Sequence, residues 1–258
     1  MTFSCWTKLT TFNAALNQWI WGAVDDNYGL VQSVTSNALT LYFSGTTYIT
    51  TSAVFRDPSA WYHIVATIDT TNATSTNRLR LYVNGVLQTI GSSAYPAQNA
   101  TGSLNSNVAH NIGRAANATR YWDGYLAEVN FIDGQALTPS SFGAYDANGI
   151  WQPVKYSGTY GTNGFYLPFS NTTSTTTLVQ DSSGNGNNWT PNNISLTAGT
   201  TYDSMIDSPT VSASSSNYAV INPINPKGTS TVTDGNLKDS CTGMQASRGS
   251  TIAVTSGK

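Results

Sequence analysis

The chain has 258 residues, of which 9% are charged, and its formal net charge is −2. This length suffices for one large β-domain or two small ones. The low charge leaves no basic surface that would attract nucleic acid or anionic lipid, so neither is expected as a partner.

Membrane insertion is not expected, because no apolar run reaches the roughly 18 residues of a membrane-spanning helix. The first residues also lack the basic and apolar segments of a signal peptide. The two cysteines, Cys5 and Cys241, form neither a metal-binding pattern nor a disulfide framework. We expect two reduced thiols, with a single bridge as the alternative.

Short strand patterns recur about every ten residues, with no long helical periodicity between them. Asn84-Gly85 separates two of these patterns and suits the positive φ angles of a type I′ hairpin. One short helix is expected at Thr138–Tyr145, with Thr138 as N-cap and Pro139 at the first helical position. The pattern predicts an all-β, antiparallel two-sheet sandwich. The expected strands are Thr2–Thr7, Gln18–Val24, Gly29–Thr35, Leu39–Phe43, Tyr62–Ile68, Leu79–Val83, Val86–Ile90, His110–Gly113 and Gly124–Ile132.

Alternation along the strands predicts which side chains are buried. In Tyr62–Ile68, Tyr62, Ile64, Ala66 and Ile68 share one face, and His63, Val65 and Thr67 share the other. In Gly124–Ile132, the set expected to be buried is Tyr125, Ala127, Val129 and Phe131.

The composition changes after Tyr145 and predicts four parts. Residues 1–145 form the sandwich, and residues 146–202 form an extension that packs on it and supplies a strand, Phe165–Phe169, with Pro168 indicating a sheet edge. Residues 203–247 are rich in Pro and Ser and are expected to be an extended linker. Residues 248–258 resemble the first strand of a further β-domain, so we expect the chain to be a fragment of a longer protein.

Four motifs of the first part carry a family resemblance. They are Phe3-Ser4-Cys5-Trp6-Thr7-Lys8, Trp61-Tyr62-His63-Ile64-Val65, Leu81-Tyr82-Val83-Asn84-Gly85 and Asp123-Gly124-Tyr125-Leu126-Ala127-Glu128-Val129. Together they resemble the laminin G-like, concanavalin A-like domain over about Thr2 to Tyr145. The resemblance implies a jelly-roll sandwich that binds glycans or proteins. In that family a further strand normally precedes the first motif, and we expect Phe165–Phe169 to pack beside Phe3–Lys8 in its place.

The later segments resemble proteins encoded by tailed bacteriophages, especially marine ones. The resemblance rests on Leu167-Pro168-Phe169, on Asp181 to Asn193 and on the linker Asn222–Leu237, while Arg248–Lys258 resembles the entry to a SPRY-like sandwich. It implies a virion surface protein, such as a tail fibre, head fibre or decoration protein. Such a protein is assembled in the host cytoplasm and exposed on the particle. Its partners would be other virion proteins and further copies of itself, although no heptads indicate a coiled-coil trimer.

A glycan-cleaving enzyme needs two carboxylates that flank the bond. The chain has a single glutamate, Glu128, with no carboxylate two residues away, and Asp133 falls on the opposite strand face. We therefore expect a structural role for Glu128 and no catalysis. The two histidines, His63 and His110, lie in strands, and structural hydrogen bonds are expected for both.

Calcium is the one cofactor for which the chain has candidate ligands. Asp181, Ser183 and Asn185 have the odd-numbered spacing of a calcium loop, but Asn192 occupies the position where such loops have a bidentate glutamate. Asp25 and Asp26 are a second candidate, because the resembling family often binds calcium at a sandwich rim. A plain turn is the alternative at both places.

A carbohydrate site in this composition would use aromatic faces together with uncharged polar groups. The best single candidate is Trp122, and its neighbours Tyr121 and Asp123 are candidates with it. Trp19, Trp21, Tyr28 and Trp189 are further candidates, because they are expected at strand ends or in loops. Packing inside the fold is the alternative for each ring.

These observations predict a non-catalytic virion surface protein whose sandwich binds a host-surface carbohydrate. The rival prediction is a structural decoration or spacer module that makes only protein–protein contacts. Exposed aromatic rings at loop tips would favour adhesion, whereas an apolar patch on a sheet face would favour protein packing. The least favoured hypothesis is that the chain is a glycan-cleaving enzyme.

Overall fold

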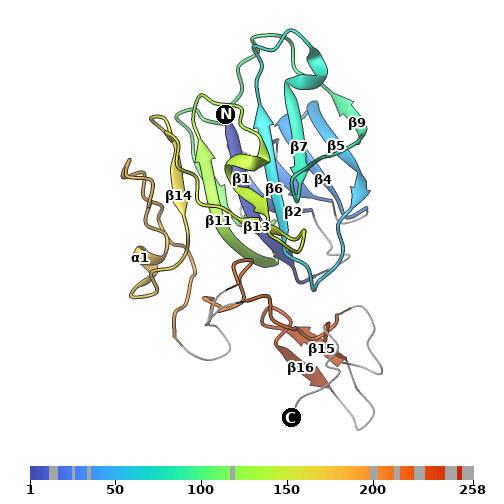
Figure 1. The fold of residues 1–258 in the computed structure, drawn as a ribbon, viewed down its shortest axis with the longest axis vertical. Coiled ribbons are helices and arrows are strands. Elements are labelled where there is room, and N and C mark those ends of the chain that lie inside the picture. The colour runs from blue at the N-terminus through green and yellow to red at the C-terminus, as the bar shows by residue number, and fades with distance from the viewer. Residues whose placement is uncertain are drawn as a thin grey trace.

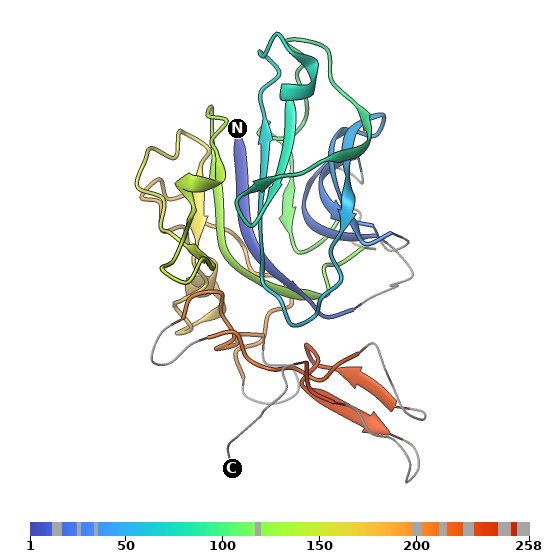
Figure 2. The same cartoon turned by 45° about the vertical axis from the view of Figure 1, so that its right-hand side comes forward.

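The computed structural model describes residues 1–11, 17–24, 27–33, 36–116, 120–197, 203–211, 216–223, 230–241 and 249–251. Two six-stranded antiparallel sheets pack face to face, as the sequence predicts (Figures 1 and 2). The first sheet has the order β14 (Phe165–Leu167), β11 (Gly124–Ile132), β1 (Thr2–Leu9), β6 (Tyr62–Ile68), β7 (Leu79–Val83) and β8 (Val86–Leu87). The second has the order β10 (His110–Ile112), β2 (Gln18–Ala23), β3 (Tyr28–Gln32), β4 (Ala38–Ser44), β5 (Thr47–Val54) and β9 (Ile90–Ala94).

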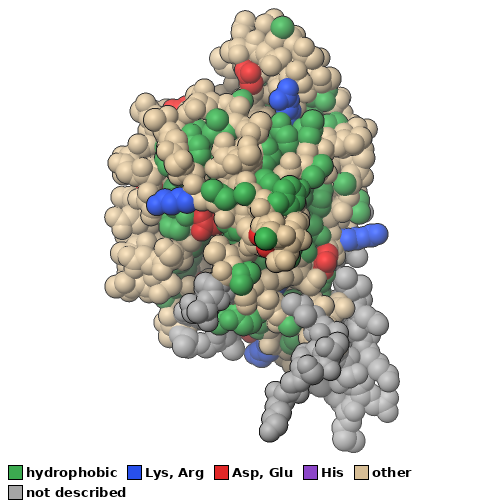
Figure 3. Space-filling view, in the orientation of Figure 1, with side chains coloured by type: hydrophobic (Ala, Val, Ile, Leu, Met, Phe, Trp, Pro, Cys, Tyr) green, Lys and Arg blue, Asp and Glu red, His purple; other side chains and the backbone are tan. Residues whose placement is uncertain are grey.

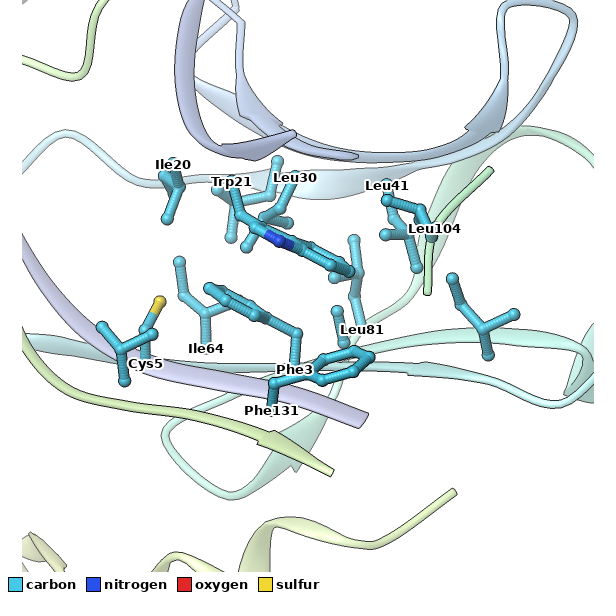
Figure 4. Packing of buried hydrophobic residues seen from close by; sticks show 14 of the residues in the cluster. Phe3, Cys5, Ile20, Trp21, Leu30, Leu41, Ile64, Leu81, Leu104 and Phe131 are labelled. Atoms are coloured by element: carbon cyan, nitrogen blue, oxygen red, sulfur yellow. The ribbon is translucent and has the colours of Figure 1, made fainter. Parts of the chain in front are cut away.

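The core fills the space between the two sheets (Figure 4). Its central contact joins Phe3 of the first sheet to Trp21 of the second, whose rings stack with centroids 4.6 Å apart. Ile64, Ala66 and Ile68 face this core, whereas Val65 packs on the other side of the sheet, so the predicted alternation of β6 is confirmed. Figure 4 also shows that the second sheet bends away from the core at its edges, which leaves its outer face concave.

The Asn84-Gly85 hairpin is confirmed, since both residues have positive φ and β7 pairs with β8. Strands β5 and β9 were not predicted; β9 begins only at Ile90, where the predicted strand Val86–Ile90 ends. The free thiol of Cys5 is buried in the core, and the side chain of Cys241 lies outside the described residues.

Strand β11 contains a bulge at Glu128, which corrects half of its predicted alternation. Glu128 has a φ of 51°, and the pairing with β1 shifts between Asn130 and Ala127. A bulge reverses the faces of the residues on one side of it. Val129 and Phe131 therefore face the core as predicted, but Tyr125 turns outward and Leu126 packs against the core in its place.

The helix predicted at Thr138–Tyr145 is only a 3₁₀ turn, η2 (Pro139–Ser141), with Thr138 as N-cap and proline in the first turn. It ends because the chain then enters β12 (Gly143–Tyr145), which pairs with β13 (Trp151–Pro153). The indole of Trp151 lies directly over Gly143, where a Cβ would come within 2.5 Å of the ring. This hairpin and the 3₁₀ turn cover the outer face of the first sheet.

The extension supplies a strand, but not at the predicted position. β14 pairs with β11, so β11 lies between it and β1. β1 has no free edge, because it already pairs with β11 and β6. β14 ends the sheet, as Pro168 predicts, and is followed by the short helix α1 (Thr175–Leu178).

The described part of 203–247 is not simply an extended linker. It packs under the end of the sandwich opposite the N-terminus and includes the hairpin β15 (Ser230–Thr233) and β16 (Lys238–Cys241) (Figures 1 and 2). Its side chains and backbone hydrogen-bond to Lys8, Trp61 and Tyr125 of the sandwich. Across the described ranges, the helices are too short and polar to form a transmembrane segment.

Candidate functional site

The outer face of the second sheet carries a row of aromatic and hydroxyl side chains. Tyr42 of β4 lies opposite Tyr48 of β5, and Thr40 lies opposite Thr50. The two tyrosine ring centroids are 5.7 Å apart, and the two threonine Oγ1 atoms are 2.9 Å apart. These four side chains share one face because residues two apart on a strand point the same way.

Trp19 extends the row onto β2. Its indole lies over Gly22 and Gly29, where an added Cβ would come within 3.0 Å and 2.9 Å of the ring. The two glycines thus let the ring lie close to the sheet. Its far side stacks on Tyr42, with centroids 6.1 Å apart and planes 19° apart.

The strands that form this face carry polar but uncharged side chains. The six strands of the second sheet contain no Asp, Glu, Lys or Arg. Burial raises the pKa of the Tyr42 phenol, and Tyr48 adds to this increase while Arg120 opposes it. Tyr42 therefore stays neutral, and the strands of this face present rings and hydrogen-bonding groups, with Arg114 and Arg120 as the positive charges near its edge.

Tyr121 stands at the β10 edge of this face. Asn111 lies opposite Gly22 and accepts a hydrogen bond from Arg114 Nε at 2.9 Å. Arg114 in turn forms an isolated bridge with Tyr121, whose side chain is 57% exposed. Of the predicted sugar-contacting residues, Tyr121 is the one with an exposed aromatic ring, and its backbone lies at the β10 edge of the face.

Trp19 and Trp21 lie within β2 and are buried, so neither presents its ring to a ligand in the way expected of strand ends or loops. A bulge in β2 between them turns Trp19 to the outer face and Trp21 into the core, although they are two residues apart. Both are buried. Trp21 cannot meet a ligand at all, and Trp19 can only support the rings above it. Tyr28 is half-buried and packs against the core.

Trp122 and Asp123 are held by the fold rather than presented to solvent. The Trp122 ring packs against the core beside Gly124, and its Nε1 is buried without a hydrogen-bond partner among the described residues. The Asp123 carboxylate accepts hydrogen bonds from the Thr10 and Thr11 hydroxyls. These contacts join the start of β11 to the end of β1. Trp189 likewise packs edge-on against Phe165.

The Asp181 loop uses its polar groups internally. The carboxylate accepts from the backbone N–H groups of Tyr166, Ser183 and Asn187 and from the Ser183 hydroxyl. The Asn185 side chain donates to the carbonyls of Gly161 and Gly164. This arrangement is that of a turn. No group of three or more His, Cys, Asp or Glu side chains within the described ranges could hold a metal ion. Asp25 and Asp26 lie outside these ranges.

Glu128 lies on the first sheet, away from the aromatic row. Its Oε2 accepts a hydrogen bond of 2.5 Å from the Tyr166 hydroxyl. Burial raises the pKa of Glu128, while Tyr166 and the positive charge of Lys155 oppose the increase. These contacts are those of a structural carboxylate at a bulge.

A cavity of about 260 Å³ opens at the N-terminal end of the sandwich, between Met1, Phe43, Leu104 and Asp133. The Asp133 carboxylate already accepts from Asn105 Nδ2 at 2.6 Å and from the Asn163 backbone at 3.2 Å. The one carboxylate that lines the cavity is therefore already held by hydrogen bonds within the fold.

Tyr42 and Tyr48 are not among the residues predicted from the sequence. A sequence pattern that indicates them is present: Thr40 and Tyr42 are two residues apart before the turn at Gly45, and Tyr48 and Thr50 are two residues apart after it. Pairing these two strands as a hairpin would have placed all four side chains on one face.

Comparison with known proteins adds the family. Residues 1–141, more than half of the chain, match the family model described as the concanavalin A-like lectin/glucanases superfamily. A similar solved structure is that of a provisionally assigned carbohydrate-binding protein from Bacteroides ovatus, with 18% identity and a TM-score of 0.35. The match covers 50% of this chain, and it spans only 36% of the length of the Bacteroides ovatus protein. No curated protein matches the chain. By its sandwich and by the match over residues 1–141, this chain belongs to the concanavalin A-like lectin/glucanases superfamily.

Proposed function

We propose that this chain is a non-catalytic carbohydrate-binding module that holds a neutral glycan on the outer face of its second sheet. The observation that carries the proposal is the row formed by Trp19, Tyr42 and Tyr48. Sugar rings present CH groups that pack on aromatic faces, and their hydroxyls bond to uncharged polar groups. The lectin and glucanase membership of the family supports this ligand class.

Each part of the face has a role in this proposal. Trp19 is a rigid base under Tyr42, which together with Tyr48 supplies the contact surface. Thr50 and Asn111 offer hydrogen-bonding groups beside the rings, and Tyr121 can cover a sugar from the β10 edge. A shallow, uncharged surface of this kind suits reversible binding of an extended polymer.

The absence of catalysis is part of the proposal. The single glutamate, Glu128, lies on the other sheet and is engaged by Tyr166. The strands of the aromatic row contain no carboxylate that could act as acid or nucleophile.

The biological setting we propose is the surface of a tailed-phage virion, where the module would bind host-surface glycan as part of a homo-oligomeric fibre. This finer proposal is supported by the resemblance of the segments Leu167–Phe169 and Asp181–Asn193 to phage virion proteins. Immunogold labelling of intact particles tests it. Label on fibres or the tail tip agrees with adhesion, label over the shell indicates decoration, and unlabelled particles contradict a place in the virion.

Glycan binding is tested by a glycan array followed by calorimetric titration of the best ligand. Tyr42→Ala should weaken binding about tenfold, because an aromatic contact contributes roughly 1 kcal/mol or more. Tyr121→Ala should also weaken it. The matched control is Tyr145→Ala: Tyr145 is 58% exposed against 57% for Tyr121, but it lies beside the first sheet. Equal affinity of the Tyr42 variant and the control would contradict the proposed face.

A second candidate function, a spacer that binds other virion proteins, is favoured by one observation. Exposed apolar side chains gather where the β7–β8 hairpin meets the β12–β13 hairpin (Figure 3). Tyr145 Oη lies 3.4 Å from the Asn84 carbonyl, so the two hairpins are in contact. We call these side chains the hairpin patch; they are Val86, Leu87, Tyr145, Ile150 and Val154.

Light scattering, which measures self-association, and calorimetric titration, which measures glycan affinity, together distinguish this role from adhesion. If the hairpin patch is a protein interface, Leu87→Lys should reduce self-association and leave glycan affinity unchanged. If the hairpin patch binds no protein, Leu87→Lys should change neither property.

A further inference from the structure

The first sheet contains a lysine that solvent does not reach. The Lys8 side chain is 0% exposed, and its partner Asp207 is 7% exposed. A buried lysine needs acceptors for its ammonium protons, since an unpaired buried charge strongly destabilises a fold. Lys8 has three acceptors, and all come from the C-terminal segment: Asp207 Oδ2 at 2.7 Å, Asn217 Oδ1 at 2.8 Å and the Tyr218 carbonyl at 2.8 Å.

Toward the Asp207 carboxylate the sandwich contributes donors. Trp61 Nε1 donates to the second carboxylate oxygen, Asp207 Oδ1, at 2.8 Å. Each oxygen of Asp207 therefore has its own donor from the sandwich, one charged and one neutral. Tyr125 lines the same place, with its ring 5.9 Å from Lys8 Nζ and 6.2 Å from the Trp61 ring. A cation and an indole N–H are complementary to a carboxylate, and the Tyr125 ring lies against the Lys8 cation.

The segment has backbone pairing of its own where it meets the sandwich. Asp207 and Ser216 form a parallel bridge, and the Ser208 N–H donates to the Ser216 carbonyl at 3.0 Å. This pairing places Asp207 next to Asn217, which accepts from Lys8 and donates to the Ser59 carbonyl at 2.8 Å. Lys8, Trp61 and Tyr125 lie within the family-matched residues 1–141, whereas Asp207 and Asn217 lie beyond them.

We propose that Lys8, Trp61 and Tyr125 form a carboxylate-binding site on the sandwich, separate from the aromatic row, and that Asp207 of the chain's own C-terminal segment is its ligand. The ligand class is an acidic side chain presented by an extended peptide. The site itself recognises the carboxylate group, so a small carboxylate of the right size should replace the Asp207 side chain. The proposal does not depend on glycan binding.

Chemical rescue of the full-length chain tests this site. Asp207→Ala removes the carboxylate and leaves room for formate, so the midpoint of thermal unfolding should fall by roughly 10 °C. Sodium formate should restore at least half of this loss along a saturating curve, whereas sodium chloride at the same ionic strength should not. Asp207→Asn is the matched control: its amide fills the space, so its midpoint should respond equally to formate and chloride.

A second variant guards against non-specific salt effects. In Lys8→Met/Asp207→Leu both charges are absent, and formate should have no more effect than chloride. If Asp207→Ala does not fold in chloride, the readout becomes the recovery of its circular dichroism spectrum in formate. Equal responses of Asp207→Ala to formate and chloride, or an unchanged midpoint in this variant, would overturn the proposal.

Discussion

The indole Nε1 of Trp151 donates a hydrogen bond to Nδ1 of His63 at 2.9 Å. Because an indole N–H can only donate, Nδ1 must be unprotonated, and His63 must carry its proton on Nε2. That nitrogen lies 2.9 Å from Ser4 Oγ and donates to it. The predicted structural role of His63 is thus confirmed, and the neutral form of the ring joins the β12–β13 hairpin to the first sheet.

The first prediction is an acid-sensitive fold. Burial lowers the pKa of His63 from 6.5 to about 3. The unfolded chain therefore binds a proton more readily, so the stabilisation is complete above about pH 6.5 and is lost as the pH falls towards 3. The loss attributable to this ring is on the order of 4 kcal/mol. Urea unfolding between about pH 7 and pH 4 measures it.

His63→Gln provides the comparison, since glutamine keeps one donor and one acceptor but does not titrate. This variant should be less stable than wild type near neutral pH and should lose less stability on acidification. Parallel pH curves for the two proteins would show that His63 is not the group responsible.

The second prediction concerns the raised pKa of Glu128, which burial causes. A raised carboxyl pKa means that the protonated form suits the fold. The corresponding stability is present below the ordinary value of 4.5 and is lost as the pH rises through the folded-state pKa. Glu128→Gln keeps an acceptor for the Tyr166 hydroxyl and removes the charge. It should make the protein more stable than wild type at neutral pH, with the gain vanishing in acid.

Tyr166→Phe is the companion variant, and it should destabilise the protein by about 1 kcal/mol through loss of the hydrogen bond to Glu128. Thermal denaturation at neutral and acid pH measures both variants. A Glu128→Gln protein that is less stable than wild type at neutral pH would show that the attraction of Lys155 outweighs the burial of the carboxylate.

The third prediction tests how closely the second sheet packs around Gly29. Gly29 has a φ of +143°, and a Cβ there would come within 2.1 Å of the Trp21 carbonyl and 2.9 Å of the Trp19 ring. Gly29→Ala should therefore cost about 3 kcal/mol or more in the free energy of unfolding. Gly149 also has a positive φ, but a Cβ there meets nothing within 4 Å. Gly149→Ala should cost only about 1 kcal/mol. Equal losses in urea unfolding would mean that the second sheet can move to admit a Cβ at Gly29.

The fourth prediction concerns calcium at the Asp181 loop. The carboxylate already accepts four hydrogen bonds, so Asp181→Ala should destabilise the chain by about 2 kcal/mol. Added calcium or a chelator should shift the unfolding midpoint of wild type and of this variant equally. A calcium response that disappears in Asp181→Ala would contradict the turn assignment. A response that disappears only in Asp25→Ala/Asp26→Ala would place the ion there instead.

Much of the fold could be predicted because the signals are local. The Asn84-Gly85 turn and the alternation of Tyr62–Ile68 depend on the φ preferences of two residues and on the two-residue repeat of a strand. β5 is not among the predicted strands. The prediction of a helix at Thr138–Tyr145 is wrong because the capping pattern on which it depends also fits a single 3₁₀ turn.

The candidate site could not be predicted in the same way, because bulges change faces without a clear sequence signal. Trp19 and Trp21 are two residues apart, so in a regular strand their rings would lie on the same face. The bulge between them places the two rings on opposite faces of the second sheet. The bulge at Glu128 does the same to Tyr125 and Leu126. Pairing with neighbouring strands decides where such a residue is accommodated.

Composition and local pattern thus determined an uncharged, antiparallel sandwich, since residue preferences and strand periodicity act over a few neighbours. Only the tertiary structure decided which rings reach the surface and which partner holds Lys8. Asp207 is 199 residues from that lysine, so their contact depends on the path of the whole chain. Burial and long-range contacts of this kind arise when the sheets pack, and no single segment encodes them.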